Sequence, residues 1–424
     1  MRSKPESDAF AAYVGIDWGD KKHDVCLSPG GNLDPRDRER FELQHDPGKI
    51  AAWATRLRKR FGGGRVAVCV ELARGPLVSA LLEHDLFVIF PINPQSLAKY
   101  RATFKVSGAK DDPSDAEFAL DFLVRHPDSL TPLKLESATM RSVRELVVSR
   151  RELVDDRTRI TNRLTAALKA FYPQVLAWFD DKSTEVFCAF LERWPTLRDA
   201  KRARPSTLEK FFRDHHVRYE AVLKRRVDAI KTAVPLTKDE GVIMPHSAVV
   251  KALVLQLRAT NQAVRDLEAA IAELVAQHED YELFSALPGA GPAFAPRLLA
   301  AFGEDRERFA NADDVQCSTG IAPVLKRSGD SLIVHMRYRC DPFLKQTFVE
   351  WASQTIPKSF WARAFYDQQR AKGVKHQVAI RALAFKWIRI LFRVWKDRIP
   401  YDETRYLQAL KKRGSSLLKN LAAA

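Results

Sequence analysis

The sequence predicts an α/β domain with a mixed sheet at the amino-terminal end, followed by a longer and mostly helical region. Before about residue 135, short β-branched and apolar runs alternate with helical patterns, which favours a sheet covered by helices. Beyond that point, apolar residues recur at helical spacing almost to the end of the chain. With 424 residues, of which 46% are hydrophobic, the chain is long enough for two or three domains.

Antiparallel strands come first in the amino-terminal part, and strand–helix–strand units follow them. Three glycines at 62–64 end the first predicted helix. This order of elements suits a ribonuclease-H-like fold, in which helices flank a mixed sheet. The expected elements are strands at 11–18, 23–28 and 38–44, a helix at 47–61, a strand at 65–71, a helix at 76–84, a strand at 86–91, and helices at 94–102 and 112–125.

Two acidic residues end predicted strands of this domain. Asp17 follows the apolar run at 13–16, and Glu71 follows the run at 66–70. A charge at the end of a buried strand is costly unless something pairs it. Mg²⁺, or Mn²⁺ in its place, would pair both acids through oxygen ligands. Because two such ions about 3.5–4 Å apart clamp the attacking and leaving oxygens of a phosphodiester, the pattern indicates chemistry on nucleic acid.

A second acidic pair, Asp112 and Asp115, lies three residues apart and therefore shares one face of a predicted helix. Helix capping is the alternative explanation of this pair. Asp112 before Pro113 suits an N-cap, and an acid three residues later completes a capping arrangement. Capping does not explain Asp17 and Glu71, so the four acids together favour a metal site.

Two long helical patterns follow, with an insert between them. Residues 137–172 are Arg-rich, and residues 250–274 carry apolar side chains at heptad spacing, with Thr260 in one seam position. The two segments could pair as an antiparallel coiled coil, associate between subunits, or be short amphipathic core helices. The insert at 173–249 is helical, aromatic and basic, without a catalytic motif. The apolar seam residues are Val250, Leu253, Leu257, Val264, Leu267, Ile271 and Leu274.

The character of the sequence changes from Leu283 onward. Gly289 and Gly291, within the segment 287–292, resemble the hairpin of a helix-hairpin-helix, whose exposed amides meet phosphates. An ordinary corner between two helices is the alternative. Residues 357–398 are helical with alternating basic and aromatic residues, and the tail after about Thr404 is expected to be loosely structured.

Ser328 is the candidate nucleophile in this half of the chain. A serine that attacks phosphorus needs cations to neutralise the developing charge, and basic residues flank Ser328. A serine before a glycine is otherwise a turn residue. Ser318 competes for the role, although its setting favours a helix-ending turn. The basic residues around Ser328 are Lys326, Arg327, His335, Arg337 and Arg339, of which His335 also fits a surface histidine.

Charge is distributed unevenly along the chain. There are 69 Lys and Arg against 53 Asp and Glu, a formal net charge of +16. Residues 1–135 hold 20 basic and 19 acidic side chains, so the remainder carries +15. The first part is near neutral and contains the acidic centre, whereas the rest of the chain is basic. This division suits a metal-dependent nuclease with separate nucleic-acid contacts. A generic basic protein is the alternative.

Cysteine usage and hydropathy argue against several other classes. The five cysteines are scattered without a Cys-x-x-Cys pair, which argues against a disulfide framework and a zinc ribbon and fits a reducing cytoplasm. The sequence opens without an apolar signal core. No uninterrupted apolar run approaches the roughly 20 residues that a membrane span needs, so no membrane partner is expected.

In combination, these motifs resemble those of the DEDD transposases of the insertion sequence 110 family, the bridge-RNA-guided serine recombinases. The matched parts cover roughly 1–172 and 250–398 and leave the insert at 173–249 unexplained. Asp111 is an alternative to Asp112 as a ligand, and the spacing to Asp115 and the following Ala116 favour Asp112. The matching segments are 15–17, Glu71, 110–116, 287–289, 308–309, 320–323, 327–329, 362–366 and 381–384.

The resemblance implies a RuvC-like domain that holds Mg²⁺ and a transposase domain in which Ser328 forms a covalent phosphoserine link to DNA. It also implies a structured noncoding RNA from the element that pairs with donor and target DNA, while the protein reads shape and backbone. A homodimer that assembles to a tetramer in the bacterial cytoplasm is expected. The implied metal ligands are Asp17, Glu71, Asp112 and Asp115; the expected nucleic-acid contacts are Arg327, Arg337, Arg339, Gly289 and Gly291.

The expected organisation is a RuvC-like domain over 1–135, a coiled-coil region with its insert over 136–280, a serine transposase domain over 281–400, and a tail over 401–424. The main rival is a structure-specific nuclease that uses only the acidic residues, hydrolyses DNA junctions with water and leaves Ser328 structural. A non-catalytic nucleic-acid-binding protein is a third possibility, and the four intact acids count against it.

Overall fold

The computed structural model divides the chain into two compact units, Met1–Leu135 and Glu136–Ala424. It describes residues 10–32, 34–71, 73–104, 112–217, 219–329, 331–338, 340–415 and 417, without the side chains of residues 112 and 113. The first unit contains the sheet that the sequence predicts, and the second is largely helical.

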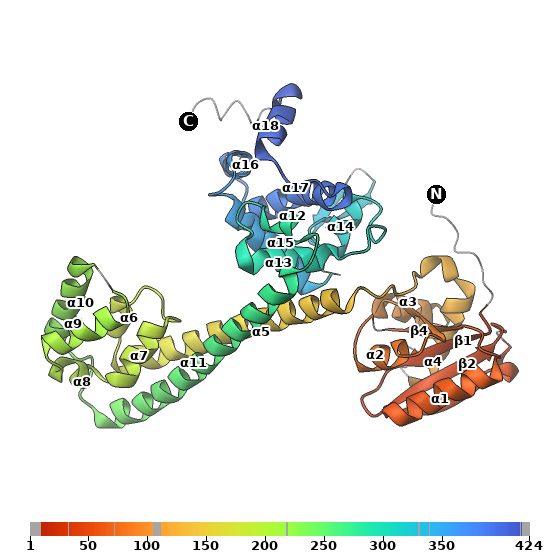
Figure 1. Cartoon of the computed structure of the whole chain (residues 1–424), viewed down its shortest axis with the longest axis horizontal. Helices are drawn as coiled ribbons and strands as arrows, with labels where there is room; N and C mark the ends of the chain where they lie inside the picture. Colours follow the sequence, from red (N-terminus) through yellow and green to blue (C-terminus); the bar gives the residue numbers. More distant parts are fainter. Residues whose placement is uncertain are drawn as a thin grey trace. The chain divides into compact units, whose positions relative to one another are not determined.

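Five strands form the sheet of the first unit, in the order β3-β2-β1-β4-β5 (Figure 1). The β1–β2 and β2–β3 pairs are antiparallel, whereas β4 lies parallel to both β1 and β5. The predicted mixed sheet is thus confirmed, and its order is consistent with a ribonuclease-H-like fold. The strands are β1 (Ala12–Asp17), β2 (Lys22–Pro29), β3 (Glu39–Gln44), β4 (Val66–Val70) and β5 (Phe87–Pro91).

Helices cover both faces of this sheet. Val14, Ile16 and Val68 point to the face covered by α1 (Pro47–Arg60) and α2 (Pro76–Leu82). The alternate residues Ala67 and Cys69 point to the face covered by α3 (Pro94–Phe104) and α4 (Asp112–Arg125). Since side chains alternate along a strand, the odd-numbered acids that follow, Asp17 and Glu71, fall on the α3–α4 side.

Gly15 sets how closely α4 lies against β1. A Cβ atom at this glycine would stand 2.0 Å from the backbone oxygen of Ala116 and 2.5 Å from the backbone nitrogen of Leu120. Such distances are far inside van der Waals contact, so only glycine allows this packing. The close contact fixes the first turns of α4, including Asp115, beside the end of β1.

Two long helices, α5 (Ala138–Phe171) and α11 (Glu240–Ala276), pack antiparallel along each other in the second unit (Figure 1). Arg150 near the start of α5 forms an ion pair with Glu268 near the end of α11. The intramolecular pairing that the sequence left open is therefore the one observed. α11 is long and apolar enough to span a membrane by length and composition alone, but its apolar side packs on α5 and α7.

The polar position in the seam of α11 differs from the expected one. Thr260 donates a hydrogen bond of 2.9 Å to the carbonyl of Gln256 in its own helix. Asn261 is instead buried and donates a 2.9 Å hydrogen bond to the carbonyl of Ser183. At the end of the seam Val275 is the fully buried residue, whereas the heptad spacing predicted Leu274. A helix with 3.6 residues per turn drifts from a strict heptad, so the buried face moves forward along the sequence.

The insert forms a small helical bundle around the ends of α5 and α11. Its core is aromatic: Phe187, Phe190 and Phe212 are fully buried and pack with Leu253 and Leu257 of α11. The helical character that the sequence predicts for 173–249 is confirmed. Its helices are α6 (Val175–Trp178), α7 (Glu185–Arg193), α8 (Leu197–Arg202), α9 (Pro205–Asp214) and α10 (Glu220–Thr232).

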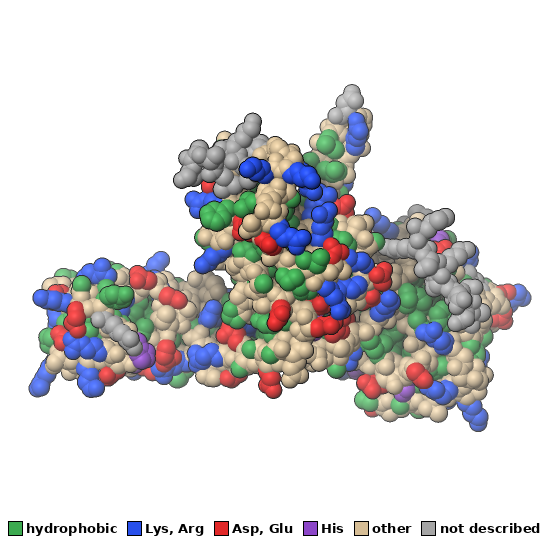
Figure 2. Space-filling model, turned by 45° about the horizontal axis from the view of Figure 1, so that its top comes forward, with side chains coloured by type: hydrophobic (Ala, Val, Ile, Leu, Met, Phe, Trp, Pro, Cys, Tyr) green, Lys and Arg blue, Asp and Glu red, His purple; other side chains and the backbone are tan. Residues whose placement is uncertain are grey.

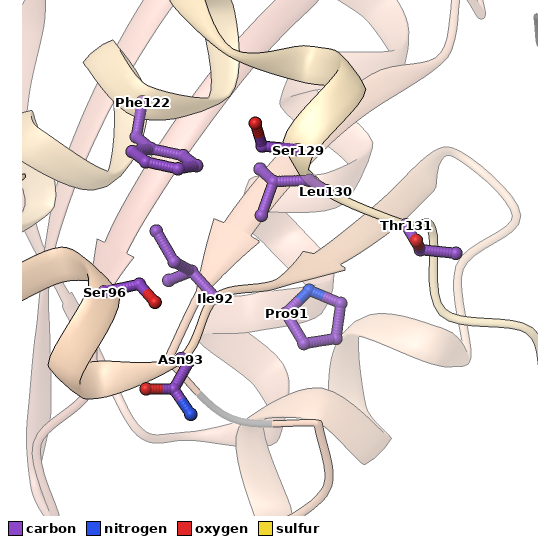
Figure 3. Close-up of a pocket in the computed structure, with 8 residues that line it drawn as sticks. All are labelled: Pro91, Ile92, Asn93, Ser96, Phe122, Ser129, Leu130 and Thr131. Atoms are coloured by element: carbon purple, nitrogen blue, oxygen red, sulfur yellow. The ribbon is translucent and has the colours of Figure 1, made fainter. Parts of the chain in front are cut away.

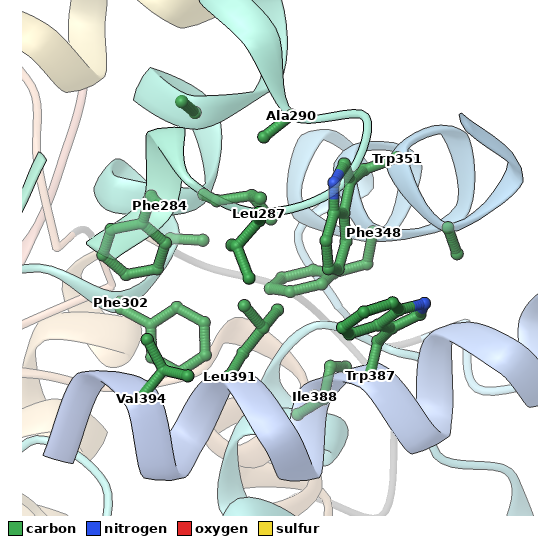
Figure 4. Close-up of a cluster of buried hydrophobic side chains, with 14 of the residues drawn as sticks. Phe284, Leu287, Ala290, Phe302, Phe348, Trp351, Trp387, Ile388, Leu391 and Val394 are labelled. Carbon is green, nitrogen blue, oxygen red and sulfur yellow. The ribbon is translucent and has the colours of Figure 1, made fainter. Parts of the chain in front are cut away.

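The carboxyl-terminal part of the second unit is a helical cluster with one β-hairpin. Phe302, Phe348, Trp351, Trp387 and Leu391 meet in its core (Figure 4). Its elements are α12 (Tyr281–Ser285), α13 (Gly291–Phe302), α14 (Ala312–Ser318), β6 (Val324–Ser328), β7 (Ser331–His335), α15 (Pro342–Thr355), α16 (Phe360–Ala371), α17 (His376–Asp397) and α18 (Glu403–Lys412).

The loosely structured tail expected after Thr404 is wrong for its first part, because α18 occupies residues 403–412. Tyr406 of this helix packs on Trp361, with ring centroids 5.1 Å apart. Glu403 accepts a 2.9 Å hydrogen bond from the Ser359 hydroxyl. The apolar residues of α18 find a surface that the sequence alone does not reveal. Residues 418–424 lie outside the described residues.

Replacing Gly15 by Ala tests the α4 contact. The added Cβ collides with backbone atoms, so we expect a loss of roughly 2–3 kcal/mol in the free energy of unfolding, as for overpacked cores. Gly62→Ala is the control, because nothing lies within 4 Å of its Cβ and only the cost of a positive φ, about 1 kcal/mol, is expected. Chemical denaturation measures both. Equal losses in the two variants would contradict the packing constraint.

Candidate acidic centre and nucleic-acid interface

Asp17 and Glu71 stand at the same edge of the sheet. The register pairs Ile16 of β1 with Val70 of β4 in parallel, so the two acids are the next residues along adjacent strands. Adjacent strands lie about 4.8 Å apart. Both acids are half-buried. The structure therefore brings together the two strand-ending acids that the sequence singled out.

Asp115 joins this edge from α4. It is 3% exposed and forms an ion pair and hydrogen bond with the guanidinium of Arg101, in the last turn of α3. The hydrogen bond with Asp115 raises the pKa of Arg101, and the negative charges of Asp115, Glu71 and Asp17 raise it further, against the effect of burial. Three of the four predicted acids thus act on one cation.

Asp112 is the first residue of α4, whereas the capping interpretation expects it just before a helix that begins at Pro113. Its side chain and the whole of Asp111 lie outside the described residues. The choice between these two acids as a ligand therefore stays a prediction from spacing. The backbone of α4 puts residue 112 one turn before Asp115.

A pair of histidines shapes the turn that follows Asp17. The Gly19 amide donates a 3.3 Å hydrogen bond to Nδ1 of His23, whose Nε2 lies 3.0 Å from Nδ1 of His45. Burial, with a smaller contribution from His45, lowers the pKa of His23 to about 4. His23 is therefore neutral at neutral pH, with Nδ1 free to accept from Gly19. The turn beside the acids is held without adding charge to them.

The donor set of this centre suits a hard divalent cation. Its donors are all carboxylate oxygens, which Mg²⁺ and Mn²⁺ prefer. Within the residues that the structure describes, no three His, Cys, Asp or Glu side chains stand at ligand spacing; the acids share Arg101 instead. By residue type and position Asp17, Glu71 and Asp115 are the described candidates for a metal site, although their side chains do not stand at ligand spacing in this structure.

A surface pocket of about 430 Å³ lies at the carboxyl end of β5, beside the start of α3 (Figure 3). Ile92, Phe122 and Leu130 form its apolar walls, while Ser96 and Asn93 stand at its rim. None of the predicted acids lines it. The pocket is therefore distinct from the acidic centre, although both lie on the α3–α4 face.

Ser328 lies at the tip of the hairpin formed by β6 and β7. It pairs in register with Ser331 across a two-residue turn, in which Gly329 has a positive φ of 56°. Ser328 is exposed, as is nearly every residue of the two strands. The Ser-Gly turn expected from the sequence is present, but the flanking strands were not predicted. Their signal is the apolar, β-branched run at 332–334 and a Gly-Asp pair suited to a hairpin turn.

The expected cations are separated along this hairpin. His335 pairs with Val324 at the opposite end from Ser328, roughly 13 Å away at the rise of a strand. Arg337 lies beyond that end, where its Nε donates a 3.2 Å hydrogen bond to the carbonyl of Ala322. Lys326 and Arg327 are the neighbours of Ser328 on β6. Arg339 lies outside the described residues.

Ser318 is the last residue of α14, in agreement with the predicted helix-ending turn. Its hydroxyl donates a 3.0 Å hydrogen bond to the carbonyl of Val315. A hydroxyl that caps its own helix in this way has a structural use. Both serines are exposed, but the Ser318 hydroxyl is engaged with its own helix, whereas Ser328 stands at a hairpin tip.

The two glycines of the helix-hairpin-helix-like segment have different settings. Gly289 has a φ of 71°, and a Cβ there would lie 2.7 Å from the carbonyl oxygen of Gln354 on α15. That contact accounts for a glycine as a packing residue of the corner. Gly291 begins α13, is exposed, and has nothing within 4 Å of a built Cβ. Of the two, Gly291 keeps the open backbone that a phosphate contact needs.

A basic stripe runs along α17. Arg381, Phe385, Arg389 and Arg393 follow each other at four-residue intervals and therefore share one side of the helix. Arg389 and Arg393 are exposed, and within the described part of the chain they form no ion pair. Lys386 beside them lies over the ring of Phe365 at 4.4 Å. Figure 2 shows Lys and Arg side chains spread over the visible face, with acidic groups among them.

Arg101 is the residue of the acidic centre that sequence reasoning missed. Its only sequence signal is its place on the helix after the third parallel strand, one helical segment before the acids at 112 and 115. Many exposed arginines occupy such positions. Its role depends on the close approach of α3 and α4, which no local pattern indicates.

The mixed sheet and its acidic edge are consistent with a ribonuclease-H-like domain, and comparison with known proteins gives the class, a transposase, and the family. A transposase model of the DEDD type named for insertion sequence 110 matches residues 14–173, and the model of the transposase IS116/IS110/IS902 family matches residues 281–367. The chain belongs to this family of insertion-sequence transposases, enzymes that cleave and transfer DNA. The DEDD domain implies use of a divalent metal.

Several relatives match nearly end to end. The mini-circle putative transposase for IS117 of Streptomyces coelicolor is 28% identical over 94% of this chain and 97% of its own length. An IS110 protein of Streptomyces coelicolor is 25% identical over 94% and 97%. An IS900 protein of Mycobacterium paratuberculosis is 25% identical over 93% and 98%. The family resemblance expected from the motifs is thereby confirmed.

Substituting Asp17→Asn or Asp115→Asn tests the acidic centre. Each amide removes the charge of one metal ligand, so we expect both variants to lose DNA transfer. Loss of a residue that only supports a ligand lowers metal affinity roughly 10–100-fold, and we expect the affinity for Mn²⁺ to fall by more than that. Asp121→Asn is the control, since this buried acid of α4 bonds Tyr100 and Arg125 instead. Isothermal titration with Mn²⁺ measures affinity. Wild-type binding by both site variants would contradict the assignment.

Substituting Arg389 and Arg393 together by Ala tests the stripe on α17. Each phosphate contact contributes roughly 0.9 to the slope of log affinity against log salt, so the double variant should lose about 1.8. Lys238→Ala with Lys251→Ala removes the same charge from exposed sites elsewhere and should leave the slope near wild type. Binding of labelled duplex DNA at several salt concentrations gives both slopes. Equal slopes in the two double variants would argue against this interface.

Proposed function

We propose that the protein joins donor and target DNA through a phosphoserine intermediate, with Mg²⁺ held by Asp17, Glu71, Asp112 and Asp115. The observation that carries the metal site is the position of Asp17 and Glu71 at the ends of adjacent parallel strands, with the start of α4, which carries Asp115, packed against β1. The observation that supports the nucleophile is the exposed position of Ser328 at a hairpin tip. The family gives the reaction class, transposition.

In this mechanism the Ser328 oxygen attacks a phosphodiester of DNA. A bond forms between that oxygen and phosphorus, one ester oxygen of the DNA leaves with a proton, and the protein is linked to the strand. A hydroxyl of the other DNA then attacks the same phosphorus, and the serine is released with a proton. Lys326 and Arg327 would neutralise the phosphate beside Ser328. Bound Mg²⁺ would supply further neutralisation of phosphate charge.

The family resemblance further suggests that a noncoding RNA of the element guides the reaction by pairing with both DNAs. The charge of +15 beyond residue 135 supports polyanionic partners of either kind. A homodimer that assembles to a tetramer, acting at the bacterial nucleoid, completes the proposal. Exposed apolar side chains of the hairpin, such as Leu332 and Val334, support assembly, because an isolated two-stranded hairpin is marginally stable.

Ser328→Ala decides between this mechanism and hydrolysis by water. We expect the variant to bind DNA and RNA normally but to lose strand cleavage and the covalent adduct, because no other group replaces the serine oxygen. Ser331→Ala is a matched control, since Ser331 faces Ser328 across the hairpin and is equally exposed. Ser318→Ala should also stay active.

Denaturing electrophoresis of the protein with labelled DNA, guide RNA and Mg²⁺ shows the adduct directly. An adduct in wild type and in both control variants, but not in Ser328→Ala, supports the serine mechanism. Cleavage by Ser328→Ala at the wild-type rate rejects it and favours a junction nuclease that uses the acidic centre alone.

A further inference from the structure

The position of Arg101 is determined by the packing of α3 on α4. Tyr100, its neighbour, donates a 2.5 Å hydrogen bond to Asp121 of α4 and packs edge-on against Phe122, with centroids 5.1 Å apart. Phe104, one turn later, stacks on Phe118 at 6.0 Å. With Tyr100 and Phe104 held against α4, Arg101 reaches the first turns of α4, where it pairs with Asp115.

Arg101 is also well matched to its surroundings in charge. The side chain of Asp115 is 4% exposed and that of Arg101 19% exposed, so water screens their ion pair weakly. Glu71 and Asp17 act on the same guanidinium. Three carboxylates repel one another, and a guanidinium stays charged at any physiological pH. A permanent positive charge therefore sits among the acids that a metal would bind.

We propose that Arg101 is a resident counter-ion of the acidic centre, which a divalent metal must displace from Asp115 in order to bind. Arg101 is thus a positioning residue that holds Asp115 in place before metal arrives and sets the affinity for metal. The inference rests on the proposed metal site at Asp17, Glu71 and Asp115. It goes beyond that site because it assigns the centre a built-in competitor.

Competition follows from the chemistry of Asp115. The carboxylate directs an oxygen to the guanidinium, and a metal ligated by the same group would stand next to a positive charge. Arg101 and metal therefore disfavour each other. Couplings between two groups that disfavour each other are commonly about 5–150-fold, so removal of the arginine charge should tighten metal binding by about 10-fold.

Two other roles of Arg101 predict different results. If Arg101 supports the ligands from outside the metal shell, its loss should weaken metal binding by roughly 10–100-fold. If it only joins α3 to α4, its loss should lower stability and leave the metal affinity unchanged. The sign of the change in affinity therefore separates the three roles.

The experiment compares Arg101→Gln and Arg101→Lys with wild type in the full-length protein, with Mn²⁺ alone as the probe. We expect Arg101→Gln to bind Mn²⁺ about 10-fold more tightly, to melt at a lower temperature in EDTA, and to gain more than wild type in melting temperature when Mn²⁺ is added. Arg101→Lys keeps the charge and should stay near wild type. Unchanged or weaker binding by Arg101→Gln overturns the proposal.

Arg125→Gln is the matched control. Arg125 forms an ion pair with Asp121 on the same helix, at a distance of 3.0 Å and away from the acidic centre. Its loss should leave the Mn²⁺ affinity at the wild-type value. If Arg125→Gln bound Mn²⁺ more tightly by as much as Arg101→Gln, the effect would be one of overall charge, and the proposal would also be overturned.

A measurement on the wild-type protein covers the case in which Arg101→Gln does not fold. Phenylglyoxal modifies accessible guanidinium groups, and mass spectrometry reports each arginine separately. Addition of Mn²⁺ should raise the modification of Arg101 several-fold and leave that of Arg125 unchanged; continued protection of Arg101 overturns the proposal. Failure of the metal site itself has a different signature, because then wild type and Asp17→Asn would both bind no Mn²⁺.

Discussion

The contact between Gly15 and α4 is the constraint on which the acidic centre depends. Because Gly15 has no side chain, the backbone of α4 at Ala116 and Leu120 comes into direct contact with β1. That contact carries Asp115 to the edge where Asp17 ends its strand. The alternation of β1 and β4 then puts Asp17 and Glu71 on the same face. Without the glycine, the acids would belong to separate layers of the domain.

The two candidate chemistries of this transposase have opposite physical settings. The acids are half-buried to buried and are fixed by a rigid sheet and its covering helices, which suits groups that must hold a cation at defined positions. Ser328 stands at the tip of an exposed two-stranded hairpin. Such a hairpin has little stability of its own, so DNA or another subunit is expected to order it. An exposed candidate nucleophile and a fixed candidate metal site would be a reasonable division of work for an enzyme that must exchange strands.

Buried charge also links the parts of the second unit. Glu350 of α15 accepts a 3.0 Å hydrogen bond from Arg297 of α13 and lies 3.2 Å from Arg151 of α5. The guanidinium of Arg297 lies between the rings of Phe294 and Phe343. Removing one partner of such a network leaves a buried charge unpaired, which is strongly destabilising. The long helix pair and the core that carries the hairpin are therefore connected by more than apolar packing.

Local patterns in the sequence determined most elements of the fold and most of the candidate residues. Such patterns located all five strands of the sheet but neither strand of the Ser328 hairpin, and an acid at the end of β1 and after β4 was visible without any structure. Heptad spacing located α11 but not its buried polar residue, because the helix drifts from a strict heptad and Asn261 finds its partner in the insert. The tertiary structure alone decided that Arg101 faces the acids, that His335 and Arg337 lie far along the hairpin from Ser328, and that α18 packs on Trp361. Each of these depends on contacts between residues distant in sequence, and such contacts leave no periodic signal in the chain.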